Sequence, residues 1–562
     1  MQAKLINKQV VTTFIWLITT GFVALAQAES FPVNINVDAK QTLEKVNPVW
    51  RFFGADEANY ATMKDGRTTL STLGALAPDN VYFRTHNLLT TGDGTPALKW
   101  GSTNAYTEDA KGNPVYDWTI VDRIFDTYRE RGIRPYVEIG FMPEALSVKP
   151  QPYQHNFRPG SGDIRTGWAY PPSDYARWEE LVFQWVTHCV ERYGREEVAT
   201  WYWQTWNEAN LPQYYWAGTQ AEFFKLHDHA IRGVRRALPD ARVGGPDIAG
   251  AGDNFMTKFI QHVQENNTPT DFLSFHAKGA PTIMQQENGA SYVRMGLDTH
   301  LRAADNEFVQ IAADPIMKTK PVIIGESDPE GCAACQGPAN AYRNGTLYSS
   351  YTAASFARLE ELADRHGILL DGILSWSFEF EDQPYFAGFR QLTSAGIDLP
   401  VMNAFKLFAK MGGNFVFSAS SAQAKLDDIM ADGVRGTADV GVRASLDADR
   451  LSVLVWHYHD DDVVGPDAAV QINLQGLPKS FAKSASLKHY RIDKDHSNSY
   501  AAWLKMGSPI APSQTQRTEL LKAAELKTID AAPAQLNIAH SATTLNFTLP
   551  RQGISFLVLT PD

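Results

Sequence analysis

The sequence has few cysteines, no excess of positive charge and no long apolar run beyond its N-terminus. Three cysteines in 562 residues are too few for a fold built on disulfides. The formal charge of −12 argues against nucleic acid or an anionic membrane surface as the main partner, since both attract basic patches. A hydrophobic content of 44% with 20% charged residues excludes disordered and collagen-like classes. The 14 Trp and 21 Tyr residues suit ligands that are part apolar and part hydroxylated.

Two signatures of bound groups are also missing. No Gly-x-Gly-x-x-Gly follows the first predicted strand to indicate a dinucleotide, and no cluster of residues has metal-ligand spacing. We therefore expect neither a cofactor nor a metal. Cys332 and Cys335 form a Cys-x-x-Cys pair, whose spacing allows a short-loop disulfide. A redox or zinc role is the weaker interpretation, because a thioredoxin-like context and further metal ligands are absent.

The N-terminus has the pattern of a secretory signal. Lys4 and Lys8 precede an apolar stretch at residues 10–26, and Ala26-Gln27-Ala28 is a small-x-small cleavage site. We expect residues 1–28 to be removed and the mature protein to be periplasmic or extracellular. A membrane anchor is the alternative, but four threonines interrupt the apolar stretch and leave it short for a membrane span.

The region from residue 51 to residue 412 alternates short apolar strands with amphipathic helices, which is typical of a parallel sheet covered by helices. Eight strand-helix units predict a closed (β/α)8 TIM barrel. The predicted strands are residues 52–55, 81–84, 134–139, 200–206, 241–244, 272–275, 321–325 and 373–377. The predicted helices include residues 117–131, 175–193, 220–238 and 351–366.

Residues 413–562 change to a period of two, with alternating segments at 451–458, 469–474, 545–549 and 554–559. This pattern predicts an accessory antiparallel β-sandwich. Residues 29–50 contain a similar alternating strand, which we expect to join that sandwich rather than the barrel.

Two predicted strands end in a carboxyl group. The aromatic strand at 200–206 leads directly into Asn207 and Glu208, and the strand at 321–325 leads into Glu326. Active sites of TIM barrels lie at the C-terminal ends of the strands, so the two carboxylates can converge there. Glycoside cleavage needs such a pair, since one carboxyl protonates the departing oxygen and the other attacks the anomeric carbon or activates water.

The ends of other predicted strands carry polar and aromatic side chains that are candidates for sugar binding. The histidines would bind ring hydroxyls or orient a carboxylate, the lysine a hydroxyl or a substrate carboxylate, the tryptophan a sugar face, and the two glutamates further hydroxyls. Each has a structural alternative, as a core histidine, a packed ring or a solvated loop. These candidates are His86, His276, Lys278, Trp376, Glu379 and Glu381.

Residues 116–122, 140–144, 206–210, 272–276 and 325–328 together resemble glycoside hydrolase family 39, which includes bacterial β-xylosidases and α-L-iduronidases. The resemblance implies a (β/α)8 barrel carrying a β-sandwich and a retaining mechanism. It also implies that Glu208 is the general acid/base, that Glu326 is the nucleophile and that Asn207 donates to the sugar 2-hydroxyl. One departure is Ala209, where the family usually has proline.

A stretch at 491–498, with Met506-Gly507-Ser508-Pro509, is similar to the β-xylosidase branch. We therefore expect a secreted exo-glycosidase that releases xylose from short oligosaccharides. An α-L-iduronidase-like enzyme is the alternative within the family, and a non-catalytic carbohydrate-binding protein is the alternative from another class. As the proton donor, Glu208 is expected to have a raised pKa.

Overall fold

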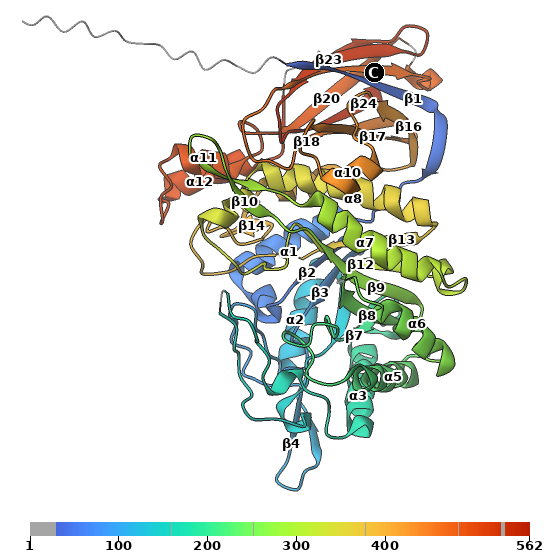
Figure 1. The fold of residues 1–562 in the computed structure, drawn as a ribbon, viewed down its shortest axis with the longest axis vertical. Helices are drawn as coiled ribbons and strands as arrows, with labels where there is room; N and C mark the ends of the chain where they lie inside the picture. The colour runs from blue at the N-terminus through green and yellow to red at the C-terminus, as the bar shows by residue number, and fades with distance from the viewer. Residues whose placement is uncertain (1–29, 159, 251, 377, 482, 530–533) are drawn as a thin grey trace, which may run out of the picture.

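The computed structural model describes residues 30–562 except 159, 251, 377, 482 and 530–533. The signal peptide predicted for residues 1–28 lies outside the described residues. Among the helices of the described part, none combines the length and the apolar character that crossing a membrane requires. A barrel and a β-rich domain lie one above the other along the long axis of the molecule (Figure 1).

Eight parallel strands close into a barrel in the order β12-β13-β2-β3-β6-β7-β8-β9, which confirms the predicted fold class. Their cores coincide with the predicted segments, and the main difference is β8, which extends five residues beyond its predicted end. The strands are β2 (Phe52–Ala55), β3 (Val81–Thr85), β6 (Ile133–Ile139), β7 (Tyr202–Thr205), β8 (Arg242–Ala249), β9 (Phe272–Lys278), β12 (Pro321–Asp328) and β13 (Leu369–Ser375).

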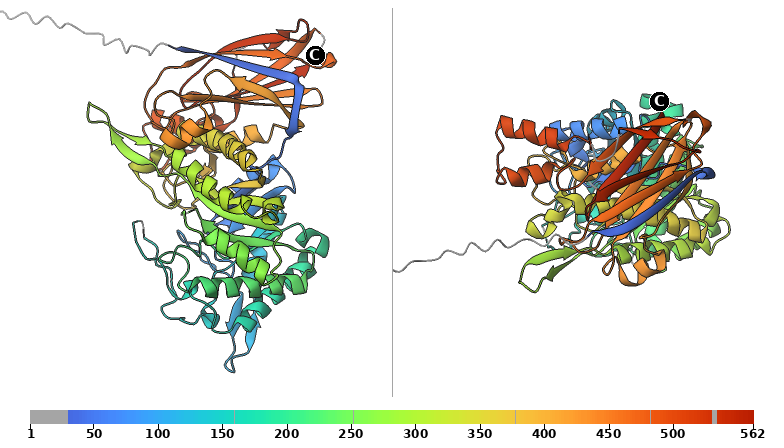
Figure 2. Two further views of the ribbon diagram at one scale, coloured as in Figure 1. Left: turned by 45° about the vertical axis from the view of Figure 1, so that its right-hand side comes forward. Right: turned by 90° about the horizontal axis from the view of Figure 1, so that it is seen from above.

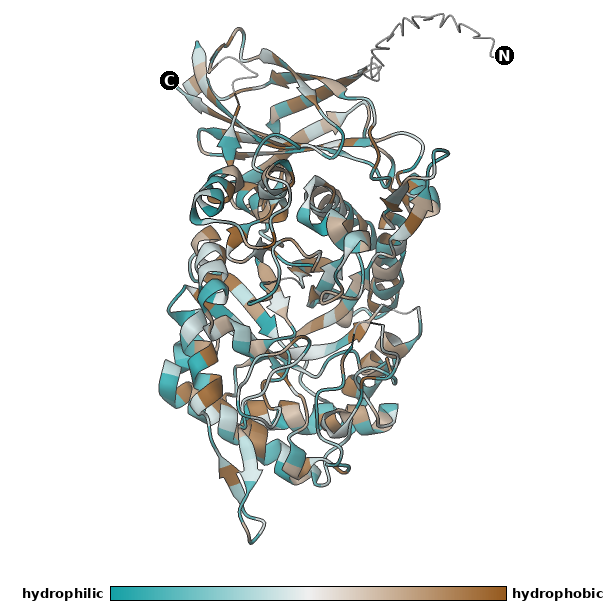
Figure 3. Cartoon of the chain, turned by 90° about the vertical axis from the view of Figure 1, so that its left-hand side faces the viewer, coloured by the Kyte–Doolittle hydropathy of each residue, from teal (hydrophilic) through white to brown (hydrophobic). Residues whose placement is uncertain are grey.

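Helices surround this barrel and carry both hydrophobic and hydrophilic segments (Figure 3). Capping fixes two of their starts: Asp174 accepts from the backbone at the start of α3, and Thr219 with Glu222 forms a capping box on α5. The helices are α1 (Lys64–Leu76), α2 (Thr119–Arg129), α3 (Tyr175–Tyr193), α4 (Arg195–Val198), α5 (Gln220–Ala237), α6 (Phe255–Glu265), α7 (Leu297–Ala312), α8 (Thr346–His366) and α9 (Pro400–Phe408).

Helix α8 starts five residues before its predicted start. It contacts β13 of the barrel and also β17 and β18 of the second domain, so most of its circumference is buried. A helix buried on more than one side loses the amphipathic period by which a start is recognised.

The second domain is a ten-stranded sheet in which β1 lies between β16 and β19. The sheet is largely antiparallel, but β1 and β19 are parallel. The chain between these two strands contains the whole barrel and the strands β16, β17 and β18. Its strands are β1 (Phe31–Lys45), β16 (Asn414–Ser420), β17 (Asp439–Asp447), β18 (Arg450–Tyr458), β19 (Ala468–Gln475), β20 (Ser484–Ile492), β21 (Lys527–Thr528), β22 (Gln535–Asn537), β23 (Thr543–Leu549) and β24 (Ile554–Pro561). Figure 2 shows β1, in blue, running along this sheet.

The two domains are joined by buried polar contacts. Arg358 of α8 donates to Asp439 of β17 at 2.7 Å, and Trp456 of β18 donates to the same carboxylate at 2.9 Å. The second domain also holds a barrel loop: Arg294, at the end of the hairpin β10 (Thr282–Gln285) and β11 (Ser291–Arg294), pairs with Asp461. That hairpin follows β9 directly.

Two helices inserted after β20, α11 (Ser499–Lys505) and α12 (Gln514–Ala524), lie on the same side of the molecule as the β10–β11 hairpin (Figures 1 and 2). Asn403 of α9 anchors them by donating to the carbonyls of Ser497 and Ala524. Cys332 and Cys335 form a disulfide in the loop after β12, and Cys189 is free and buried in α3.

Candidate active site

The two predicted carboxylates meet at the C-terminal end of the barrel. Glu326 is the sixth residue of β12, and Glu208 lies in the turn after β7, where its backbone NH donates to the carbonyl of Asp247 at 2.9 Å. Trp206 and Glu208 both have positive φ, 67° and 41°, a conformation that non-glycine residues rarely adopt. Carboxylate oxygens of Glu208 and Glu326 lie within 4.8 Å of one another.

Lys278, at the end of β9, bridges these two carboxylates. Its Nζ lies 3.1 Å from Glu208 Oε1 and 2.5 Å from Glu326 Oε2. His276, two residues earlier on the same face of the strand, has Nδ1 2.7 Å from Glu208 Oε1 and Nε2 3.0 Å from Asp247 Oδ2. Glu208, His276 and Glu326 have the spacing of metal ligands, and the Lys278 ammonium supplies a cation to both carboxylates.

These cations keep both carboxylates ionised, which differs from the raised pKa expected for Glu208. Burial alone would raise the pKa of Glu208, but Lys278 and His276 outweigh burial and hold its pKa well below the ordinary value. For Glu326, burial is likewise outweighed by His276 and Lys278, and the pKa is lowered to about 2. Burial would lower the pKa of His276, but Glu326 and Asp247 raise it to about 9.

Arg84, the last but one residue of β3, lies beneath the two carboxylates and had no role in the sequence analysis. It is fully buried, and its guanidinium lies 3.3 Å from Glu326 Oε1 and 2.8 Å from Glu138 Oε2 and forms an ion pair with Asp247. It also donates to Asn207 Oδ1 at 2.8 Å. Its position directly before Thr85-His86 at a strand end could have marked Arg84 as a site residue. No sequence pattern, however, predicts which buried strands supply the partners of its guanidinium.

Asn207 lies next to Glu208 and is fully buried. Its side-chain oxygen is occupied by Arg84, which fixes the orientation of the amide. Its Nδ2 has no hydrogen-bond partner among the residues that the structure describes. A buried donor without a partner is costly, so this amide is positioned to donate to a ligand.

His86 and Trp376 form one wall of the site, with ring centroids 4.5 Å apart. His86 Nδ1 lies 2.5 Å from Glu138 Oε2, and Trp376 Nε1 donates to Asp56 Oδ2 at 3.1 Å. Gly54 allows this packing, since a Cβ there would lie 2.4 Å from the Trp376 ring. The structure therefore brings His86, His276, Lys278 and Trp376 together with the two glutamates.

Glu379 and Glu381 do not join this group, although they follow the eighth barrel strand. Glu381 accepts hydrogen bonds from the backbone NH groups of Asp65 and Gly66 at the start of α1. Glu379 accepts from Thr393 and from the backbone NH groups of Ala395 and Gly396. Both carboxylates are used to hold loops and a helix N-terminus, where negative charge is favoured.

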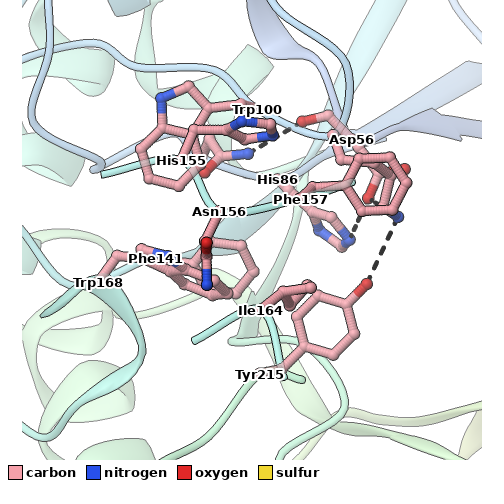
Figure 4. Close-up of a pocket in the computed structure, with 12 residues that line it drawn as sticks. Asp56, His86, Trp100, Phe141, His155, Asn156, Phe157, Ile164, Trp168 and Tyr215 are labelled. Atoms are coloured by element: carbon pink, nitrogen blue, oxygen red, sulfur yellow. Dashed lines mark hydrogen bonds and ion pairs between the residues drawn. The ribbon is translucent and has the colours of Figure 1, made fainter. Parts of the chain in front are cut away.

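A pocket opens beside His86 (Figure 4). Aromatic rings supplied by several loops form much of its wall, and Asp56 and Lys99 lie at one side of it. The lining residues are Asp56, His86, Asn87, Lys99, Trp100, Phe141, His155, Asn156, Phe157, Ile164, Trp168 and Tyr215.

The arrangement supports acid/base and nucleophilic chemistry at a sugar. Carboxyl groups roughly 5–5.5 Å apart are characteristic of glycosidases that form a covalent intermediate, whereas roughly 6.5–9.5 Å leaves room for a water molecule between them. The separation of the Glu208 and Glu326 oxygens, within 4.8 Å, fits the first class.

Comparisons with known proteins agree with this chemistry. The profile of the family described as Glycosyl hydrolases family 39 matches residues 33–538. A β-xylosidase of Geobacillus stearothermophilus is 28% identical over 429 residues, covering 74% of this chain and 76% of that protein. An α-L-iduronidase of Mus musculus is 24% identical over 545 residues, covering 88% and 75%. The crystal structure of the GH39 enzyme from Xanthomonas axonopodis pv. citri has the same fold, with a TM-score of 0.74, 22% identity and coverage of 95% and 98%.

Proposed function

Because this chain belongs to glycosyl hydrolases family 39 and is therefore a glycoside hydrolase, we propose that it is a retaining exo-β-xylosidase. It would release xylose from the non-reducing ends of short oligosaccharides. The observation that carries the retaining mechanism is the pair of carboxylates, Glu208 and Glu326, whose oxygens lie within 4.8 Å. The similarity to the β-xylosidase of Geobacillus stearothermophilus supports the choice of sugar.

In this proposal the two glutamates divide the reaction. Glu326 attacks the anomeric carbon while Glu208 gives its proton to the departing glycosidic oxygen, which leaves a glycosyl ester on Glu326. Glu208 then takes a proton from water, the resulting hydroxide attacks the same carbon, and the ester bond breaks to regenerate both carboxyl groups. His276, Lys278 and Arg84 hold Glu326 ionised for the first step. Asn207 donates to the 2-hydroxyl as positive charge develops on the sugar.

The low pKa of Glu208 in the substrate-free site gives Lys278 a part in this cycle. A proton donor must carry its proton when substrate is bound, and Lys278 favours the ionised form. We infer that the bound sugar separates the Lys278 ammonium from Glu208, which removes one of the two cations that lower the pKa of Glu208, so that this pKa rises.

A second candidate is an α-L-iduronidase-like activity, and Lys278 is the observation that favours it. This partly buried cation would pair with a carboxylate on the substrate instead of with Glu208. The α-L-iduronidase of Mus musculus is similar over most of the chain. In this case the substrate itself would draw Lys278 away from the acid/base.

Hydrolysis of an aryl β-xyloside against an aryl α-L-iduronide separates the two candidates. The proposal expects the higher kcat/KM on the xyloside, with the β-anomer of xylose as the first product seen by NMR. A preference for the iduronide, or an inverted product, would contradict it. Glu326→Gln is the control: turnover that survives this change does not come from this site.

We also propose that the protein is exported with removal of residues 1–28, on the basis of the signal pattern in its sequence. N-terminal sequencing of the protein recovered from outside the cytoplasm should begin at Glu29. A start at Met1 in that fraction would contradict the proposal.

A further inference from the structure

The pocket beside His86 contains a second charged pair that the reaction described above does not use. Asp56 follows β2, and Lys99 lies in the loop after β3. Lys99 Nζ lies 2.6 Å from Asp56 Oδ1. Asp56 is 2% exposed and the Lys99 side chain 10% exposed, so the pair is shielded from bulk water.

The pair is held in place from both sides. Trp376 Nε1 donates to the second oxygen of Asp56 at 3.1 Å, and the backbone NH of Lys99 donates to Glu57 Oε1 at 2.5 Å. Lys99 itself has a φ of +59°, a conformation that costs a non-glycine residue free energy. The strained backbone and the contact with Asp56 together fix the position of the Lys99 side chain.

His86 connects this pair to the reaction centre. Its Nε2 lies 3.4 Å from Asp56 Oδ1 and 3.9 Å from Glu326 Oε1, and it makes a hydrogen bond with neither. The Asp56–Lys99 pair and the nucleophile therefore flank one histidine nitrogen, so that a single sugar ring can reach both of them.

The rest of the pocket fits a polyhydroxylated ring. Phe141, Trp168 and Tyr215 pack against one another along its wall, with centroids 4.8–6.5 Å apart, and sugars pack their CH faces on such rings. Nε2 of His155 and Nε1 of Trp168 have no hydrogen-bond partner within the described part of the chain. Tyr215 OH lies 3.5 Å from Lys99 Nζ.

We propose that Asp56 and Lys99 bind the hydroxyl groups on the edge of the glycone that faces away from the cleaved bond, and so make the enzyme specific for a free, unsubstituted non-reducing end. Two neighbouring hydroxyls suit this pair, because the carboxylate accepts from one while the ammonium donates to the other. The inference rests on the proposed glycosidase function of the same site, but not on which sugar is cleaved.

Deoxy substrates test the proposal. Wild type, Asp56→Asn and Lys99→Met are assayed on an aryl β-xyloside and on its 3-deoxy and 4-deoxy analogues. A hydrogen bond to a charged group is worth about tenfold or more in kcat/KM, so wild type should lose about tenfold or more on at least one analogue. On the parent glycoside, the kcat/KM of each variant should be lower than that of wild type by a similar factor. On the analogue that wild type cleaves poorly, the kcat/KM of each variant should be within about twofold of that of wild type.

Asp93→Asn is the matched control, since Asp93 is exposed in the same loop and holds only a local turn through the backbone NH of Thr95. It should match wild type on every substrate. Variants that lose the same factor on parent and deoxy glycosides would show that the pair only holds the loop, which overturns the proposal.

Wild type alone provides a second measurement if the variants fail to fold. Inhibition by xylose and by its deoxy analogues gives relative affinities, and equal affinities overturn the proposal. If the xyloside is not a substrate, the proposed sugar fails but the inference does not: the same series is then run on the glycoside that is cleaved and on its deoxy analogues.

Discussion

Arg84 and Glu326 lie side by side at the base of the site, with Arg84 Nη1 3.3 Å from Glu326 Oε1. Arg84 also approaches Glu138 and Asp247, so one guanidinium orients Glu326, the proposed nucleophile, and offsets the charge of three buried carboxylates. A lysine ammonium would not replace this guanidinium, because it lacks the planar set of donors that contacts several carboxylates at once.

Arg84→Lys should keep the charge and lose its planar geometry. We expect kcat on aryl glycosides to fall by about 10²-fold, the usual cost of losing a preorganised donor at the reacting group. Steady-state kinetics on a phenyl glycoside, which has a poor leaving group, checks this, because formation of the glycosyl ester on Glu326 is then the slow step that kcat reports. Retained kcat with only a lower Tm would assign Arg84 a structural role alone.

Glu208→Ala should spare glycosides with good leaving groups more than those with poor ones. Only a poor leaving group needs a proton from the enzyme, and general acid catalysis is worth about 10²–10⁴-fold. The comparison is kcat/KM for dinitrophenyl and for phenyl glycosides. Equal losses on both would contradict the acid assignment, and Glu197→Ala, at a solvent-accessible ion pair on α4, serves as the control.

Lys278→Met should move the alkaline limb of the pH profile. The lysine lowers the pKa of Glu208, and the limb of kcat/KM at high pH reports loss of the proton from the acid in the free enzyme. Removing the cation raises that pKa, so activity on a phenyl glycoside should persist to higher pH. A limb that stays in place would argue against the contact, and Lys111→Met, in an exposed turn, is the matched control.

His227→Leu should stabilise the protein. His227 is buried in α5, neither ring nitrogen has a partner in the described residues, and burial lowers its pKa to about 4. An unpaired buried polar group costs about 1–3 kcal/mol. The unfolded chain binds a proton near pH 6.5, so stability falls as pH drops from about 6.5 towards 4, and the leucine variant removes that part of the fall.

Urea unfolding of wild type and His227→Leu at neutral and at mildly acidic pH measures both effects. His188→Leu is the comparison, because His188 is bonded to Asp122 at 2.7 Å and partly exposed, and its loss should not stabilise. A His227→Leu protein less stable than wild type at both pH values would show that water or packing already satisfies this ring.

Arg358→Met should weaken the contact between the domains. It leaves the Asp439 carboxylate buried without its cation, which typically costs about 3–5 kcal/mol. The double variant Arg358→Met with Asp439→Asn should recover part of this loss, because no buried charge then remains. Denaturant unfolding of the three proteins checks the cycle, and additive losses in the double variant would contradict direct coupling.

The barrel, and the position of Glu208 and Glu326 at the ends of its strands, could be predicted from the sequence because they depend on local patterns: apolar strands at regular intervals, two of which lead into a glutamate. Asp247 shows what such patterns miss. The predicted strand stopped at Gly244, before Gly245-Pro246, whereas β8 continues to Ala249 and places Asp247 3.0 Å from His276. The sequence does not reveal the neighbour of Asp247 either. Gly325 leaves space for this side chain, because a Cβ at residue 325 would lie 2.1 Å from Asp247 Oδ1.

Glu379 and Glu381 are residues that the sequence places at the sugar site but the structure does not. Their position after the eighth strand predicts proximity to the sugar, but their partners are backbone NH groups of α1 and of the 393–396 turn. A strand end gives the side of the barrel on which a side chain starts. It does not give the direction that the following loop takes, which depends on long-range packing.

The pairing of Arg294 with Asp461 ties the loop that begins at Lys278 to the second domain. The backbone NH of Met295 reinforces it by donating to the carbonyl of Asp460 at 2.8 Å. The second domain therefore helps to hold a loop of the barrel in place. A recombinant barrel joined to a foreign β-domain would keep the strands that carry Glu208 and Glu326, but it would lose the two contacts that hold the far end of the loop after Lys278.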